Sequence, residues 1–238
     1  MKKYSKLHLW MIGIMLLVQA TIFNYYWPSF SSKTWEFHFH YWLVTAWFVF
    51  LIIQPYLAVT GKIEKHKTWG IIGFLIAGGA IFTGFSLLDY PLRLIENLTP
   101  DRPGPPVGFY YGTLVVEFVL MAAFTYAIIK GIIHRKNLKE HSWWLIASAF
   151  YMMMPAVGRG MIVFWRATLP PEKLNPLLIT LSAELIYIPL FLLFAHKFGK
   201  IKHQATFIGL LLALVRALRF PIGSLEGVQE FLKAFIQY

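Results

Sequence analysis

The chain has 238 residues, of which 58% are hydrophobic, 18% aromatic and only 14% charged, and its formal net charge is +11. Soluble domains are about 45–50% apolar and about 25% charged, so this composition argues against a water-soluble domain and indicates contact with lipid. Cysteine is absent, which excludes disulfide frameworks, thiolate nucleophiles and cysteine metal sites.

Apolar runs of about 20 residues, long enough to cross a bilayer core, recur along the chain. They predict an all-α transmembrane bundle of about seven helices that forms one domain over residues 1–222. The spans are expected at 7–27, 39–60, 68–88, 109–130, 142–165, 176–196 and 204–222. The first run resembles a signal peptide but continues to Trp27, which favours a retained helix. The last span requires Arg216 and Arg219 to snorkel toward the membrane surface.

Basic residues are concentrated in alternate loops. Thirteen of the 22 Lys and Arg fall in the N-terminal segment and after the second, fourth and sixth predicted spans: Lys2, Lys3, Lys6, Lys62, Lys65, Lys67, Lys130, Arg135, Lys136, Lys139, Lys197, Lys200 and Lys202. The positive-inside rule makes these loops and the N-terminus cytoplasmic. Because the positive charge lies in short loops between apolar runs, we expect a lipid bilayer partner and no nucleic acid.

Two segments outside the spans have their own patterns. The outer loop, at about 89–108, is rich in proline, which predicts a stiff, non-helical cap over the bundle. The C-terminal tail, 223–238, predicts a short amphipathic helix lying at the membrane interface. Its apolar face carries Leu225, Val228, Leu232 and Phe235.

A weak internal repeat links two predicted helical hairpins. His66 and Trp69 begin the third span, and His141 and Trp144 begin the fifth, with 75 residues between the members of each matched pair. This spacing predicts that spans two and three and spans four and five are repeated helical hairpins. A third copy in the last two spans has His203 but lacks the tryptophan.

Short motifs follow one another at the second and third spans. A histidine begins one helix, a glutamine lies late in it, and a His-Lys-x-x-Gly turn leads into the next; these residues are His40, Gln54, His66, Lys67 and Gly70. Over about residues 38–160 the chain resembles bacterial multi-pass membrane proteins of unknown function with a His-Arg/Lys-x-x-Gly turn. The resemblance implies a bacterial plasma (inner) membrane, and it implies no activity.

Three ionisable residues fall inside predicted spans: Glu117, Arg159 and Glu184. At about 1.5 Å per residue, all three lie roughly 9–12 Å below the outer surface. Unpaired charges at that depth are costly, and an arginine can donate to two carboxylates at once. We therefore expect Arg159 to pair with both acids, which raises the pKa of one of them and favours proton or cation handling.

Polar neighbours extend this cluster into a predicted pocket open to the outer side. Thr113 shares a helix face with Glu117, Tyr151 with Arg159, and Tyr187 with Glu184, while His40 begins the second span at the outer surface. The predicted ligand-binding residues are Glu117, Arg159, Glu184, Tyr151, Tyr187, Thr113 and His40. The function this favours is binding or conducting a proton, an ion or a small polar ligand.

Two alternatives remain open from the sequence. His66 and His141 are candidate axial ligands of a haem in a membrane electron-transfer protein. Buried charges can also be purely structural, as in a non-catalytic membrane subunit or an assembly factor. The sequence contains no P-loop, His-Glu-x-x-His or Gly-x-Ser-x-Gly motif, so it assigns no reaction, and it predicts no metal site besides the haem alternative.

Overall fold

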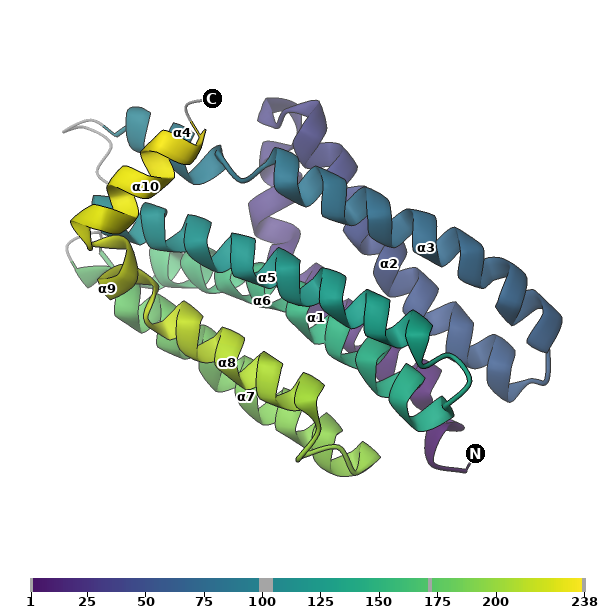
Figure 1. The fold of residues 1–238 in the computed structure, drawn as a ribbon. Coiled ribbons are helices and arrows are strands. Elements are labelled where there is room, and N and C mark those ends of the chain that lie inside the picture. The colour runs from purple at the N-terminus through teal and green to yellow at the C-terminus, as the bar shows by residue number, and fades with distance from the viewer. Residues whose placement is uncertain (1, 99–104, 171–172, 237–238) are drawn as a thin grey trace.

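The computed structural model describes residues 2–98, 105–170 and 173–236, and their regular structure is entirely helical (Figure 1). In chain order the elements are η1 (Lys2–Tyr4), α1 (Leu7–Tyr26), η2 (Trp27–Ser32), α2 (Trp35–Val59), α3 (Ile63–Ser86), α4 (Tyr90–Glu96), α5 (Val107–Ile133), α6 (Leu138–Thr168), α7 (Pro176–Phe198), α8 (Gln204–Ala217), α9 (Arg219–Gly223) and α10 (Glu226–Ile236). The predicted all-α class is confirmed.

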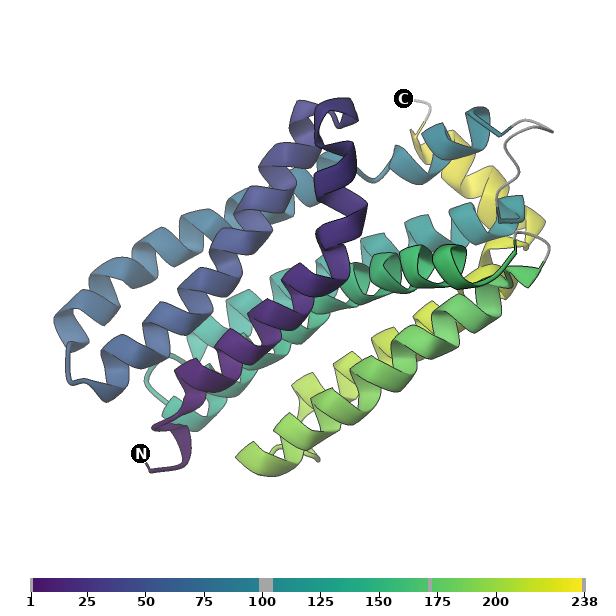
Figure 2. The same ribbon diagram turned by 180° about the vertical axis from the view of Figure 1, so that it is seen from behind.

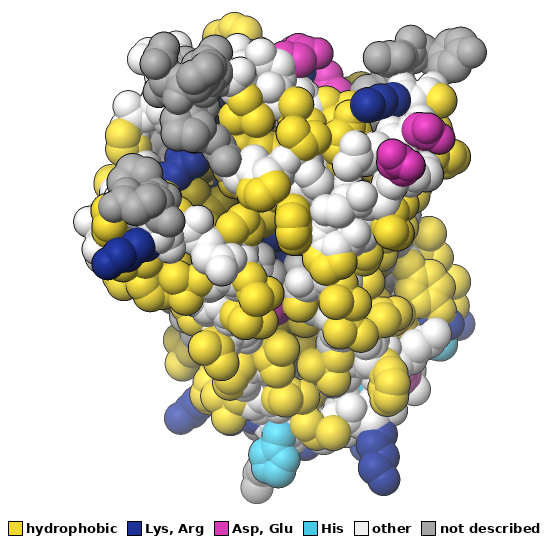
Figure 3. Space-filling view, turned by 90° about the vertical axis from the view of Figure 1, so that its left-hand side faces the viewer, with side chains coloured by type: hydrophobic (Ala, Val, Ile, Leu, Met, Phe, Trp, Pro, Cys, Tyr) yellow, Lys and Arg dark blue, Asp and Glu magenta, His cyan; other side chains and the backbone are white. Residues whose placement is uncertain are grey.

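Six helical segments among the described residues are long and apolar enough to cross a membrane. Large hydrophobic side chains on their outer faces stay uncovered; Phe82 and Leu185, for example, are 74% and 75% exposed. Figure 3 shows hydrophobic side chains over most of one face, with Lys, Arg and His projecting at its lower end. Such a surface is stable in lipid and unfavourable in water, so the chain is a multi-pass membrane protein.

Three hairpins and one additional helix build the bundle. The hairpins are α2–α3, α5–α6 and α7–α8, and α1 packs against α2 and α6 (Figures 1 and 2). Helix α6 also contacts α5, α7 and α8, so its middle is the core of the molecule. The side chains of Trp143, Phe150 and Tyr151 are completely buried there.

The α2–α3 and α5–α6 hairpins place one histidine at the same position. His66 is the fourth residue of α3, and His141 is the fourth residue of α6. Both therefore occupy the first turn of the second helix of a hairpin, as the predicted repeat requires. His203 differs, because it is the N-cap of α8 and its ring accepts from the Ala205 backbone N–H. The third copy of the repeat is therefore incomplete.

The two ends of the bundle differ in composition and structure. The N-terminus and the turns after α2, α5 and α7 lie at one end, which carries the thirteen clustered basic residues and is called the basic end below. Helices α4, α9 and α10 gather at the opposite end, called the distal end (Figures 1 and 2).

The seventh predicted span, 204–222, forms two helices. Helix α8 has 14 residues, about 21 Å at about 1.5 Å per residue, which is shorter than a bilayer core of about 30 Å. The helix breaks at Leu218, and α9 then packs closely against α5. A Cβ on Gly112 of α5 would lie 1.7 Å from the Arg219 carbonyl oxygen, so glycine is required for this approach.

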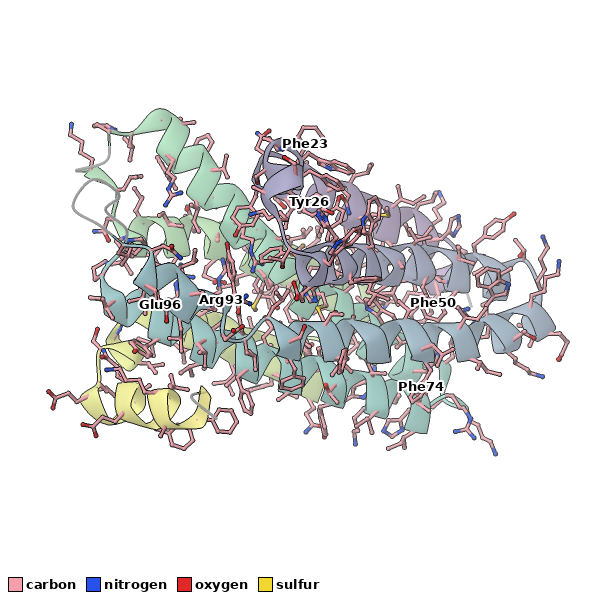
Figure 4. The ribbon with its side chains drawn as sticks, turned by 90° about the horizontal axis from the view of Figure 1, so that it is seen from above. Phe23, Tyr26, Phe50, Phe74, Arg93 and Glu96 are labelled. Atoms are coloured by element: carbon pink, nitrogen blue, oxygen red, sulfur yellow. The ribbon has the colours of Figure 1, made fainter. Side chains whose placement is uncertain are left out.

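The outer loop is partly helical, contrary to the expectation of a non-helical cap. Residues Tyr90–Glu96 form α4, in which Pro91 occupies the first turn and Arg93 pairs with Asp89 at 2.9 Å. Proline is tolerated in a first turn because its missing N–H has no intrahelical acceptor there. Figure 4 shows Arg93 and Glu96 on this short helix, well away from Phe50 and Phe74. Pro100 and Pro103 lie outside the described residues.

The predicted C-terminal helix is present as α10. Leu232 is buried in a small cluster with Tyr111 and Leu114 of α5, whereas Phe231 and Phe235 remain exposed. Its position at a membrane interface stays a prediction.

Candidate functional site

The expected cluster of one arginine and two glutamates is divided into two ion pairs. Arg159 pairs with Glu117, with Nη2 and Oε1 3.3 Å apart. Glu184 pairs instead with Arg216, with Oε1 and Nη1 3.3 Å apart. The expectation that Arg159 joins both acids is therefore wrong. Arg216 reaches Glu184 because Gly158 leaves room beside α6, where a Cβ would lie 2.5 Å from Arg216 Nη2.

The Glu117–Arg159 pair lies on the wall of a cavity of about 100 Å³ in the distal half of the bundle. Segments of α1 to α6 line this space, which is called the distal cavity below. Its polar side chains include Gln19, Tyr25, His40, Tyr90, Glu117 and Arg159. The side chains of Arg159 and Glu117 keep 25% and 23% of their surface exposed. Both are therefore accessible to a ligand or to water in the cavity.

His40 is held at the cavity wall by α3. Its Nδ1 lies 3.1 Å from Thr83 Oγ1, and the Thr83 hydroxyl donates to the Gly79 carbonyl at 2.8 Å. Because the hydroxyl proton is used in the second bond, Nδ1 of His40 donates in the first. A neutral His40 then keeps an unprotonated Nε2 in the part of the bundle that contains Arg159.

Side chains from α1 contribute to the cavity, and none of them was among the predicted site residues. Gln19 Oε1 accepts from the Tyr41 hydroxyl at 2.6 Å, and Gln19 Nε2 donates to Thr45 Oγ1 at 3.2 Å. Arg159 Cζ lies 5.6 Å from the centre of the Tyr25 ring. A glutamine within an apolar span is itself a sequence signal for an interhelical contact, and that signal was available in α1.

The second ion pair belongs to a separate, deeply buried group, called the arginine cluster below. The side chains of Arg216 and Glu184 are only 4% and 7% exposed. Arg219 donates to Thr180 Oγ1 at 2.6 Å and stacks 3.8 Å above the Phe109 ring. The expectation that Arg216 and Arg219 snorkel outward is therefore wrong, because both find partners on α5 and α7 inside the protein.

Electrostatic contact dominates the arginine cluster. Within the described residues, neither carboxylate oxygen of Glu184 nor either terminal nitrogen of Arg216 has a partner with hydrogen-bond geometry. Two guanidinium groups and one carboxylate leave one positive charge. Such a group is typical of a helix-packing element that is costly to break.

Three other predicted site residues lie outside the distal cavity. Tyr151 donates its hydroxyl to the Ala205 carbonyl at 2.6 Å and so ties α6 to α8. Thr113 donates to the Phe109 carbonyl of its own helix at 2.7 Å. Tyr187 is fully buried, and its hydroxyl has no hydrogen-bond partner among the described residues. Of the seven predicted residues, the cavity brings together His40, Glu117 and Arg159.

The two histidines of the haem alternative do meet. The ring centres of His66 and His141 are 6.4 Å apart, and the ring planes are nearly perpendicular. His141 Nδ1 donates to the Gly131 carbonyl at 2.8 Å, which leaves Nε2 available as a ligand. In the part of the chain that the structure describes, no three His, Asp or Glu side chains form a metal-binding group.

Comparison with protein-family models, curated protein sequences and solved structures finds no match. The fold and the site define a multi-pass helical membrane protein with an internal cavity and two ion pairs between its helices.

Proposed function

We propose that the protein binds a proton or a small polar ligand in the distal cavity, with the basic end in the cytoplasm of a bacterial cell. The position of the Glu117–Arg159 pair on the wall of this internal cavity carries the proposal. Intramembrane ionisable residues that line a wet cavity commonly mark binding sites and proton pathways. A cavity of about 100 Å³ has room for water molecules, and the charged pair on its wall offers them hydrogen-bond partners.

A proton or a charged ligand can replace either partner of the ion pair. Protonation of Glu117 releases Arg159 from its partner, and the guanidinium is then free to bind an anionic group. A ligand with an amine competes for Glu117, and a ligand with a carboxylate competes for Arg159. His40 supplies a third polar group, whose unprotonated Nε2 can accept a hydrogen bond from a ligand or water. This proposal does not need two carboxylates sharing a proton, since Glu184 belongs to the arginine cluster.

Infrared difference spectroscopy of the reconstituted protein tests this function. Titration between about pH 4 and pH 9, the range that covers carboxyl and histidine groups, is expected to show a carboxylic acid band that Glu117→Gln abolishes. Glu64→Gln is the control and should leave this band in place, because Glu64 is exposed at the basic end and lies outside the cavity. If Glu117→Gln removes no titrating band, the pair is structural, as in the subunit or assembly-factor alternative.

The contact between His66 and His141 favours haem binding as the second candidate. A metal about 2 Å from a nitrogen of each ring requires two imidazoles that face one another at close range. Adding haemin to the purified protein is expected to give a Soret band of a six-coordinate haem. His66→Ala and His141→Ala should each change that spectrum, whereas His134→Ala, at the same end of the bundle, should not. An unchanged haemin spectrum on adding protein ends this candidate.

A further inference from the structure

A second cavity, of about 340 Å³, lies at the basic end between η1, the start of α6 and the turn between α7 and α8. Each of these three segments contributes one lysine: Lys3, Lys139 and Lys200. The volume falls in the range of small-ligand sites. This cavity is called the lysine pocket below, and it is distinct from the distal cavity.

The apolar walls of the lysine pocket are well fixed. Tyr4 is buried and stacks on Phe198 with ring centres 5.2 Å apart. Gly199, at φ 67°, ends α7 in the left-handed conformation that favours glycine. A Cβ at Gly199 would lie 3.1 Å from Lys3 Nζ, so the ammonium group sits directly against this turn. The pocket therefore has a defined shape although its lysines reach solvent.

The charges around the lysine pocket do not balance. Lys200 pairs with Glu140, which also lies 2.7 Å from His203 Nε2. Within the described residues, Lys3 and Lys139 have no ion-pair or hydrogen-bond partner. Three ammonium groups against one carboxylate leave two positive charges when His203 is neutral. A site with this excess attracts an anion of one or two charges.

The backbone at the pocket also favours an anion. Leu138 and Lys139 lie in the first turn of α6, where backbone N–H groups have no intrahelical acceptor and the helix dipole is positive. At the end of α7, by contrast, the Gly199 and Lys200 N–H groups donate to the His196 and Ala195 carbonyls. That end of the helix therefore offers the pocket little unpaired negative charge.

We infer that the lysine pocket binds a phosphate group, carried by an anionic phospholipid headgroup or free in solution. The pocket lies where lipid-facing helices end, and the exposed Leu138 lies on its edge. Basic pockets at the ends of transmembrane helices are suited to anionic headgroups. This excess suits a phosphodiester headgroup, which carries one negative charge, or a free phosphate, which carries up to two.

Native mass spectrometry of the full chain in detergent tests the site with three probes: short-chain phosphatidylglycerol, short-chain phosphatidylcholine and inorganic phosphate. We expect phosphatidylglycerol to bind more tightly than phosphatidylcholine. A basic residue near an anionic lipid contributes about fivefold in binding, so the pair Lys3→Gln and Lys139→Gln should weaken it about thirtyfold. The matched control is the pair Lys65→Gln and Lys67→Gln, which removes two exposed charges at the same end of the bundle and should change binding little.

The probes separate the two sources of phosphate. Inorganic phosphate that binds as tightly as phosphatidylglycerol, and is lost in the same variant, assigns the pocket to free phosphate. Preference for phosphatidylglycerol assigns it to a headgroup. Equal binding of both lipids together with no phosphate binding overturns the inference, as does an equal loss in the two double variants. All four lysines are exposed, so the variants are expected to fold, and their thermal unfolding is measured alongside.

Discussion

Glu184 of α7 faces Arg216 of α8 at 3.3 Å in the interior of the bundle, while Arg159 of α6 turns toward Glu117 of α5. Two ion pairs therefore form between helices of the bundle, one almost fully buried and one beside a cavity. This difference in exposure predicts different consequences of breaking each pair.

Glu184→Gln should destabilise the protein strongly. The substitution removes the carboxylate that pairs with the buried Arg216, and breaking a buried pair in this way typically costs about 3–5 kcal/mol. Unfolding by denaturant in detergent micelles measures the loss. Adding Arg216→Met to Glu184→Gln should recover part of the stability, because it removes the stranded charge. Wild-type stability of the single variant would contradict a charged, buried Glu184–Arg216 pair.

Glu117→Gln should affect stability much less. Both partners keep about a quarter of their surface exposed at the distal cavity, where water can solvate the remaining Arg159 charge. The same unfolding measurement therefore ranks Glu117→Gln well below Glu184→Gln. A loss for Glu117→Gln equal to that for Glu184→Gln would show that the distal cavity is dry and that the pair is structural.

The six long apolar helices were predictable, because the bilayer imposes length and apolarity on each segment separately. Lysine clusters likewise marked the basic end from local sequence alone. The partner of Glu184 was not predictable in this way. Counting residues along each span placed Glu117, Arg159 and Glu184 at the same depth in the membrane. Such a count does not say which helices are neighbours or how each helix is rotated about its axis.

The missing information lies in close contacts between helices. Gly158 admits the Arg216 side chain to the surface of α6, and the break at Leu218 turns Arg219 toward Thr180. Neither feature has a signature in the periodicity of a single segment. Helix α4 is a different case. Pro91 lies at its N-terminus, where proline is a known signal for the start of a helix. The other prolines of this segment favoured the prediction of a non-helical loop instead.

Gly112→Ala should loosen the distal end. An alanine Cβ at this position would meet the Arg219 carbonyl oxygen at 1.7 Å, so α5 and α9 must separate, at a cost of about 1–3 kcal/mol. Gly78→Ala is the control, since nothing lies within 4 Å of a Cβ there and alanine favours helix by about 1 kcal/mol. Thermal unfolding should therefore fall for Gly112→Ala and hold or rise for Gly78→Ala. A fall of the same size in both variants would contradict the tight α5–α9 contact.

The two ends of the chain should lie on opposite sides of the membrane. Helices α8 and α9 together carry the chain from the basic end to the distal end, although α8 alone is too short to cross (Figure 1).

The chain contains no native cysteine, so single cysteines report their own accessibility. In intact cells a membrane-impermeant maleimide should label Glu226→Cys in α10 and Arg93→Cys in α4. Lys65→Cys, in the first turn of α3 at the basic end, should react only after the membrane is permeabilised, because basic segments at the ends of spans are retained in the cytoplasm. If Glu226→Cys instead behaves like Lys65→Cys while Arg93→Cys is labelled, α8 and α9 turn back within the membrane, and the buried positions of Arg216 and Arg219 need another explanation.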